Sequence, residues 1–216
     1  MEKPQVVFFD AVGTLFGVRG SVGKIYSQLA QNVGVNVSPD KVNQAFAASF
    51  KASDPLAFPG VKSVDIPSQE FKWWGAIARA TFDKVGVLEQ FGDFDEFFNQ
   101  LYGYFATPEP WFIYDDVLPV LEQWQTQDVQ MGIISNFDSR IHSVLHGLEL
   151  GDLFSSVTIS STVGAAKPDG KIFEAALAKY QCEPQQALHI GDSFQEDYQG
   201  AKAAGLQALF LKRQVL

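Results

Sequence analysis

The sequence predicts an α/β protein with a doubly wound parallel sheet and an inserted group of helices. Short apolar runs of the length of strands recur along the chain, and in its C-terminal half they alternate with helical periods. This alternation is typical of a parallel sheet that is covered by helices on both faces. A long interval after the first apolar run, residues 17–106, has helical spacing instead. The 216 residues suffice for one domain with an insert or for two small domains.

Five apolar runs are the predicted strands of the sheet. They comprise residues 6–9, 131–135, 157–160, 187–190 and 208–211. Their length and dense apolar composition fit strands that are buried on both faces. Helical periods separate the last four runs, at residues 141–148, 172–177 and 196–204. The last of these helices is closed by Gly205, a residue type typical of helix C-termini.

The interval 17–106 predicts a separate helical group, because it has no run comparable with the predicted strands. Ten of the nineteen phenylalanines lie between residues 46 and 105, so we expect this group to have an aromatic core of its own. One long loop is expected inside it, at residues 51–65. The expected helices begin at Val22, at Ser38 with Pro39, after Ser68 and after Asp93. The chain therefore divides into a core of residues 1–16 and 107–216 and a helical domain of residues 17–106.

Composition and charge exclude several classes of function. Sixteen Lys and Arg residues against twenty-five Asp and Glu residues give a formal net charge of −9, without any basic run. Such a chain lacks the electrostatic features of nucleic-acid binding and of binding to anionic membranes. The single cysteine, Cys182, excludes an intramolecular disulfide, and no apolar run approaches the roughly 18 residues of a membrane span. We expect a soluble, cytoplasmic protein.

Polar residues follow the first two predicted strands. Asp10 ends the first apolar run, and Gly13 and Thr14 after it allow a tight turn around an anion. Asp10 at this position suits a nucleophile, although it could also cap the next turn. Ser135 ends the second run and Asn136 follows it, where both side chains could donate to phosphate oxygens or cap the following helix.

Two further motifs lie later in the chain. Lys167 stands just ahead of a predicted helix, a position at which most lysines are solvated. Asp192 and Asp197 lie five residues apart around a strand-to-helix turn, and hard oxygen ligands on such a turn suit Mg²⁺. His189 lies on the strand before the turn, where a buried core histidine is the expectation rather than a base.

Read together, the four motifs resemble the haloacid dehalogenase superfamily of hydrolases over residues 6–211. Asp10, Gly13 and Thr14 match its first motif, Ser135 the second, Lys167 the third, and Gly191, Asp192 and Asp197 the fourth. The resemblance implies a Rossmann-like sheet of strand order 5-4-1-2-3, with the helical group as a cap placed after the first strand. In capped members the residues that set specificity lie in the cap. Candidates are Arg19, Lys24, Trp73, Trp74 and the loop 51–65.

The resemblance also implies a chemistry. It is that of a Mg²⁺-dependent phosphatase of small phosphorylated metabolites, which acts through an aspartyl-phosphate intermediate. The implied catalytic residues are Asp10, Ser135 and Lys167, and the implied substrate-binding residues are Thr14, Ser135, Asn136 and Lys167. The implied metal ligands are Asp10, Asp192, Asp197 and the backbone carbonyl of Val12.

Val12 departs from the usual phosphatase motif of the family, which has a second Asp at this place. That Asp protonates the leaving alcohol and later deprotonates water, so its absence predicts a weaker enzyme. A metal-free 2-haloacid dehalogenase is a second reading, against which the Gly191 and Asp192 pair counts. A third is a catalytically lapsed protein that binds a phosphorylated ligand or partner. The opening Asp-Ala-Val-Gly-Thr-Leu is also similar to the domain-containing protein 3 branch of the family, for which the resemblance implies a fold but no substrate.

Overall fold

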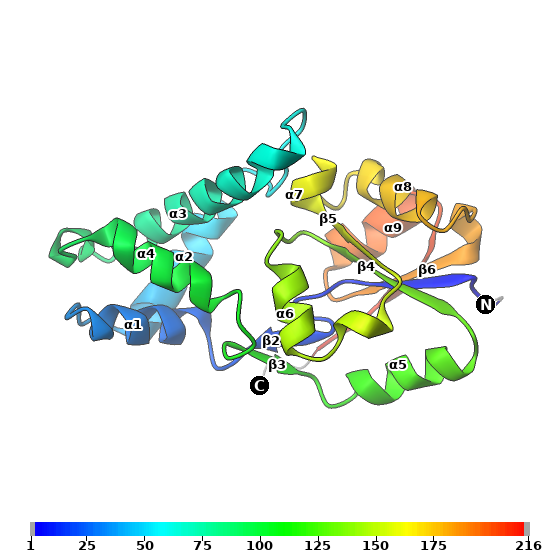
Figure 1. Ribbon diagram of the computed structural model, residues 1–216, viewed down its shortest axis with the longest axis horizontal. Helices are drawn as coiled ribbons and strands as arrows, with labels where there is room; N and C mark the ends of the chain where they lie inside the picture. Colours follow the sequence, from blue (N-terminus) through cyan, green and yellow to red (C-terminus); the bar gives the residue numbers. More distant parts are fainter. Residues whose placement is uncertain (1–2, 214–216) are drawn as a thin grey trace.

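The computed structural model describes residues 3–213 and contains a five-stranded parallel sheet with helices on both faces, beside a group of long helices (Figure 1). The strands of this sheet are β1 (Val6–Phe9), β4 (Gln130–Ser135), β5 (Ser156–Ile159), β6 (Ala187–Gly191) and β7 (Gln207–Phe210). Their order is β5-β4-β1-β6-β7, and every neighbouring pair is parallel. The predicted α/β fold is confirmed. When these strands are numbered one to five along the chain and the sheet is read from the β7 edge, their order is 5-4-1-2-3, as the resemblance implies.

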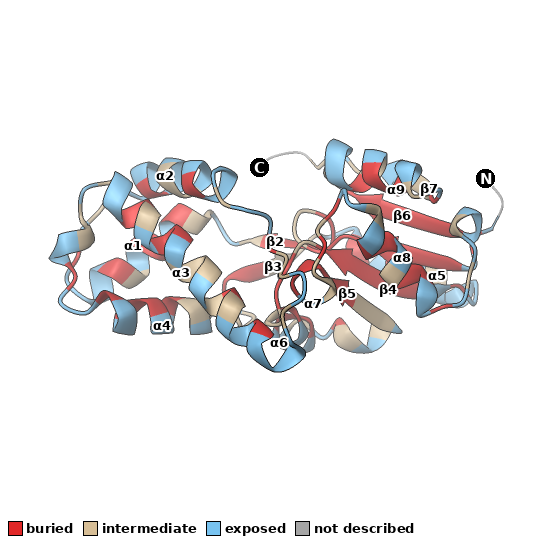
Figure 2. Ribbon diagram, turned by 90° about the horizontal axis from the view of Figure 1, so that it is seen from above, coloured by how far each residue is buried: buried red, intermediate tan, exposed pale blue. Residues whose placement is uncertain are grey.

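Strand β1 lies at the centre of the sheet because both of its faces are apolar. All four of its residues are buried, and their side chains alternate between the two faces. Val7 and Phe9 belong to the apolar core under helices α5 (Val117–Thr126) and α6 (Ile141–Gly147). Val6 and Phe8 belong to the core under helices α8 (Gly170–Ala178) and α9 (Gly200–Ala203). Figure 2 shows β4 and β6 largely buried, the edge strand β5 partly buried, and the surrounding helices buried on one side only.

The helices around the sheet connect successive strands. They are α5 (Val117–Thr126), α6 (Ile141–Gly147), α7 (Ser160–Val163), α8 (Gly170–Ala178) and α9 (Gly200–Ala203). A π-helical turn, η5 (Phe194–Gln199), precedes α9. Short 3-10 helices are η1 (Ser63–Asp65), η2 (Leu88–Gln90), η3 (Gly151–Leu153) and η4 (Pro184–Gln186). In the part of the chain that the structure describes, no helix is both long and apolar enough to cross a lipid bilayer.

The group of long helices has the aromatic core that the sequence predicts. It comprises α1 (Val22–Asn32), α2 (Pro39–Lys51), α3 (Ile66–Lys84) and α4 (Phe94–Tyr104). Phe82 of α3 is fully buried, lies parallel to Tyr26 of α1 and makes edge contacts with Phe97 of α4. Each such aromatic pair contributes roughly 0.5–1.5 kcal/mol beyond the burial of its area.

Two strands and one long helix are among the elements that were not expected from the sequence. Strand β2 (Phe16–Val18) lies at the start of the interval for which no strand was expected, and it pairs antiparallel with β3 (Trp111–Ile113). Both strands have three residues, which is too short for a periodic pattern, and their pairing joins segments that are far apart in the sequence. Helix α5 was also missed, although it connects β3 to β4 and covers one face of the sheet.

Two expected helix boundaries were wrong. Helix α3 begins at Ile66, with Pro67 in its first turn, so Ser68 lies inside the helix rather than before it. Proline at the first turn fits because the amide it lacks would have no partner there. The predicted helix 196–204 is split into the π-helical turn η5 and the short α9.

Candidate active site

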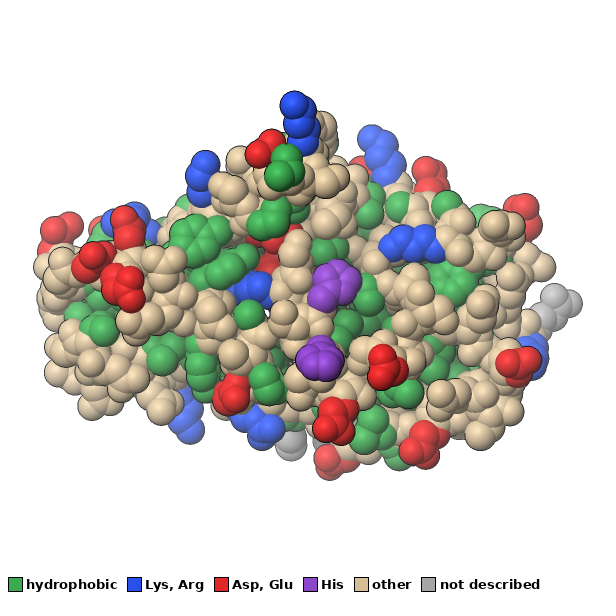
Figure 3. All heavy atoms as spheres, in the orientation of Figure 1, with side chains coloured by type: hydrophobic (Ala, Val, Ile, Leu, Met, Phe, Trp, Pro, Cys, Tyr) green, Lys and Arg blue, Asp and Glu red, His purple; other side chains and the backbone are tan. Residues whose placement is uncertain are grey.

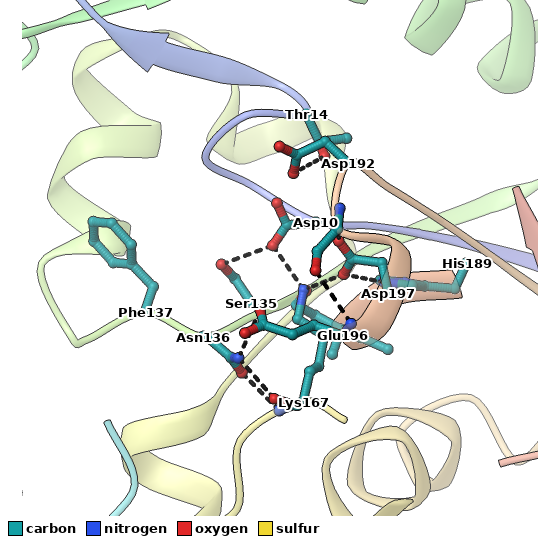
Figure 4. A network of polar contacts seen from close by, with 12 residues as sticks. Asp10, Thr14, Ser135, Asn136, Phe137, Lys167, His189, Asp192, Glu196 and Asp197 are labelled. Atoms are coloured by element: carbon teal, nitrogen blue, oxygen red, sulfur yellow. Dashed lines mark hydrogen bonds and ion pairs between the residues drawn. The ribbon is translucent and has the colours of Figure 1, made fainter. Parts of the chain in front are cut away.

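Polar side chains gather at the carboxyl ends of three neighbouring strands (Figure 4). Asp10 follows β1, Ser135 ends β4 and Asp192 follows β6, in the part of the sheet with the order β4-β1-β6. Open α/β sheets bind ligands at this end. Lys167 and Asp197 reach the same place from the loop before α8 and from η5. Together with the helical group these residues enclose a cavity of about 710 Å³, which we call the reaction cavity.

Lys167 is the cation of this site. Its side chain is buried, and Nζ donates to Asp10 Oδ1 at 2.7 Å, to Asp197 Oδ1 at 2.6 Å and to the Ile134 carbonyl at 2.9 Å. Burial alone would lower the pKa of Lys167, but the charges of Asp10 and Asp197 more than compensate and raise it. The ammonium group therefore stays charged and holds the two carboxylates on either side of it.

Asp197 is fixed by three donors. Besides Lys167, Asp197 Oδ1 contacts His189 Nε2 at 2.9 Å, and Oδ2 accepts the Ser193 amide at 2.9 Å. Burial alone would raise the pKa of Asp197, but the hydrogen bond from His189 and the charge of Lys167 hold it well below its usual range. His189 is completely buried, and burial lowers the pKa of its imidazole. This is the core position that the sequence predicts for His189.

Asp10, Asp192 and Asp197 have the arrangement of a metal site. One carboxylate oxygen from each lies within 4.8 Å of the others. Burial and then the charges of Asp10 and Asp197 raise the pKa of Asp192 to about 6, so the cluster resists full ionisation on its own. Three carboxylates at this spacing fit a hard divalent cation, whose charge would offset their repulsion.

The turn after β1 is built around Gly13 and Thr14. Gly13 has a φ of +92°, and a Cβ at this position would overlap the carboxylate of Asp192. The Thr14 hydroxyl donates to Asp192 Oδ1 at 3.3 Å, and Thr14 is almost completely buried. Thr14 is not among the residues that line the reaction cavity, and in this structure its hydroxyl positions Asp192.

Gly13→Ala is expected to destabilise the fold by about 2–3 kcal/mol and to reduce hydrolysis, because the new methyl group displaces Asp192. Gly34→Ala is the matched control, since Gly34 has a similar φ of +86° and open space around it. Urea unfolding of both variants separates backbone strain from the displacement of Asp192. Equal losses of stability would show that contact with Asp192 is unimportant.

Comparison with known proteins decides the family. Residues 4–205 match the family model of the haloacid dehalogenase-like hydrolases. The chain belongs to this family. A relative from Danio rerio, the haloacid dehalogenase-like hydrolase domain-containing protein 3, is 32% identical over 207 residues, which are 96% of this chain and 84% of the relative. This confirms the resemblance of the four motifs, and the chain is a hydrolase.

Solved structures of the haloacid dehalogenase fold include both phosphatases and dehalogenases. A phosphatase of the family from Thermococcus onnurineus has a TM-score of 0.63 and 22% identity, covering 97% of this chain and 87% of its own. The L-2-haloacid dehalogenase from Xanthobacter autotrophicus has a TM-score of 0.69 and 17% identity. The match covers 98% of this chain and 79% of the dehalogenase chain. Phosphatases and dehalogenases therefore share this fold, so the fold does not show which of the two reactions this chain catalyses.

Ser135 and Asn136 have different surroundings in this hydrolase. The Ser135 hydroxyl donates to Asp10 Oδ1 at 3.3 Å. Asn136 accepts from the Lys167 amide at 2.7 Å, and its Nδ2 donates to the Lys167 carbonyl at 3.0 Å and to Glu196 Oε2 at 3.2 Å. Asn136 thus holds the loop that carries Lys167. Its predicted role in substrate binding would require it to release Glu196.

The helical group contributes one wall of the reaction cavity. Phe50, Trp73 and residues 53–56 line it, whereas Arg19 and Lys24 do not. The indole of Trp73 donates to the Asp54 carbonyl at 3.0 Å and so fixes the loop beside the cavity. In Figure 3, acidic and basic side chains are visible at depth between hydrophobic side chains, in the middle of this face of the molecule.

Sequence reasoning missed how the fourth motif is folded. Four residues separate Asp192 from Asp197, and the turn that contains most of them is π-helical. Such turns accommodate an extra residue in a helix and are frequent at functional sites. Here the turn directs Asp197 toward Lys167 and brings Glu196 to Asn136. The five-residue spacing of the two acids, one longer than an α-helical turn, was the available signal.

Proposed function

We propose that this hydrolase is a Mg²⁺-dependent phosphatase of small phosphorylated metabolites, with Asp10 as its nucleophile. The observation that carries the proposal is how Asp10 is held. Lys167 and Ser135 both donate to its Oδ1, whereas its Oδ2 accepts no hydrogen bond from any residue in the range 3–213. One oxygen is thus fixed, and the other is left to attack a phosphorus atom in the reaction cavity.

The first step would transfer the phosphoryl group to Asp10. An oxygen of Asp10 forms a bond to phosphorus, and the bond from phosphorus to the leaving oxygen breaks, with the electron pair going to that oxygen. Lys167 and Ser135 would offer their donors to the phosphoryl oxygens as negative charge develops there. A divalent cation held by Asp10, Asp192, Asp197 and the Val12 carbonyl would neutralise further charge on those oxygens. Water would then cleave the aspartyl phosphate.

We also propose that residues 17–106 act as a cap over a core of residues 1–16 and 107–216. Contacts between the two support this. The Trp74 indole of α3 donates to Asp138 Oδ2 at 2.6 Å, and the buried Glu70 accepts from both the amide and the hydroxyl of Ser139. The cap would exclude water from the reaction cavity and supply its specificity.

The test is phosphate release from a panel of small phosphate esters, with Mg²⁺ and with a chelator. Release is expected with Mg²⁺ and is expected to stop with the chelator. Asp192→Asn should weaken Mg²⁺ binding by about 10- to 100-fold, because it removes one charged ligand. Asp128→Asn is the control: it removes the same charge from an exposed turn far from the cluster, where Asn tolerates the positive φ.

Two outcomes would contradict the proposal and support a different function. Undiminished turnover in chelator, with 2-chloropropionate as a substrate, would indicate a metal-free dehalogenase. Binding of inorganic phosphate and Mg²⁺ without turnover of any ester would indicate a protein that has lost catalysis, the reading that Val12 supports.

A further inference from the structure

A second cavity of about 210 Å³ adjoins the reaction cavity on the side of the helical group. The two cavities share four lining residues, Val12, Phe50, Asn136 and Phe137. Val12 lies two residues after the proposed nucleophile, so a group bonded to a phosphate at Asp10 could extend past Val12 into the second cavity. We call this space the side cavity.

The side cavity is built from aromatic rings. Eight aromatic residues that line it come from the helical group or from β3: Tyr26, Phe46, Phe50, Trp74, Phe98, Tyr102, Phe105 and Trp111. Several pack edge to face, as Phe105 does against Trp111 with ring centroids 5.6 Å apart. Such walls are rigid and favour a flat apolar ligand.

Arg140 is the ionised side chain that lines the side cavity, and its positive charge is already paired with the carboxylate of Asp138. Arg140 donates from Nε and Nη2 to the two carboxylate oxygens of Asp138, at 2.8 and 2.7 Å. Its guanidinium lies over the ring of Tyr102, 3.8 Å from the centroid, and donates to the Tyr102 carbonyl. Arg140 is therefore committed to protein partners and does not attract a second anionic group of a substrate.

We propose that the side cavity holds the aromatic leaving group of the substrate, so that the natural substrates are aryl phosphates. This inference rests on the proposed phosphatase function and names its substrate class. The volume suffices, since an apolar cavity of about 150 Å³ accommodates benzene. Two independent features agree: the aromatic walls fit an aryl ring, and Val12 offers no proton to the leaving oxygen.

The chemistry explains why Val12 is tolerated. When the bond between phosphorus and the aryl oxygen breaks, the electron pair leaves on that oxygen as an aryloxide. Its negative charge is shared with the ring, so it needs no proton in the transition state and takes one from solvent after release. A carboxylate at position 12 would instead place a charge in the wall of an apolar cavity.

The test is calorimetric binding of two non-hydrolysable phosphonates in the presence of Mg²⁺. Benzylphosphonate is isosteric with phenyl phosphate and ethylphosphonate with methyl phosphate, since a methylene replaces the bridging oxygen in each. Benzylphosphonate should bind at least about tenfold more tightly, because only it places a ring in the side cavity. Equal affinities would overturn the inference even if phosphate esters are hydrolysed. Conversely, ring-dependent binding without any hydrolysis would overturn the phosphatase proposal and leave an aromatic binding site.

Two matched variants locate the ring. Val22→Phe fills the side cavity from the start of α1 and should reduce the preference for benzylphosphonate to about twofold or less. Val33→Phe makes the same change at the exposed end of α1, outside the cavity, and should leave the preference unchanged. A preference that survives Val22→Phe in a folded protein would place the ring elsewhere and overturn the inference.

Discussion

Lys167→Met is expected to reduce phosphate release by about 10³-fold or more and to destabilise the fold by about 3–5 kcal/mol. Lys167 is the only cation within hydrogen-bonding distance of Asp10 and Asp197 among residues 3–213. Removing it leaves two buried carboxylates without their counter-charge, beside the carboxylate of Asp192. The repulsion among the three acids then opposes folding and also displaces Asp10, the proposed nucleophile.

Urea unfolding and phosphate-release assays measure the two effects. Lys179→Met is the control, because Lys179 also donates from Nζ, to the Val157 carbonyl and to Thr158, but is exposed and contacts no acid. It should cost about 1 kcal/mol and leave phosphate release intact. Similar effects of the two variants would show that Lys167 contributes only hydrogen bonds from its side chain and not a charge that the site requires.

Val12→Asp is expected to raise turnover of an alkyl phosphate by about tenfold or more, and a well-positioned acid–base group would contribute about 10²- to 10⁴-fold. Val12 lines the reaction cavity two residues after Asp10, where a carboxyl group could protonate an alkoxide and then activate water. Transfer from an aryl phosphate should gain little in its first step, because an aryloxide leaves without a proton.

Val12→Asn is the control for this substitution, since its side chain has the shape of Asp but does not titrate. Steady-state turnover of phenyl phosphate and of a simple alkyl phosphate gives the comparison. An equal gain in Val12→Asn would mean that polarity or packing at position 12 matters, not proton transfer. A wild-type enzyme that already turns over the alkyl phosphate rapidly would show that another group, such as Glu196 in the lining of the reaction cavity, supplies the proton.

The motifs at strand ends could be predicted because their geometry follows from the sheet. Asp10, Ser135 and Asp192 each follow a dense apolar run, and the carboxyl ends of adjacent parallel strands must lie together. Lys167 has no such signal, because a lysine before a helix is usually solvated. Only the order of the motifs indicated its role, and its contact with Asp10 joins residues 157 positions apart.

The side cavity could not be predicted for a related reason. Its walls come from four helices, from β2 and β3, and from the segments after β1 and β4. The separation of these walls depends on how the helical group packs against the sheet. Helical spacing predicts which residues of one helix share a face, as for Phe94 and Phe97, but not which faces leave a space between them. Strands β2 and β3 could not be predicted from periodicity either, because each has only three residues. Their pairing fixes where the chain enters and leaves the helical group.

The most direct measurement is mass spectrometry of the Asp10 peptide after acid quenching during turnover of phenyl phosphate with Mg²⁺. Because Val12 provides no base for the attacking water, the second step should be slow and the intermediate should accumulate. We predict a burst of phenol close to the enzyme concentration and one phosphoryl group on Asp10, both absent in Asp10→Asn. Steady turnover with no burst and an unmodified Asp10 peptide would contradict the assignment of Asp10 as the nucleophile.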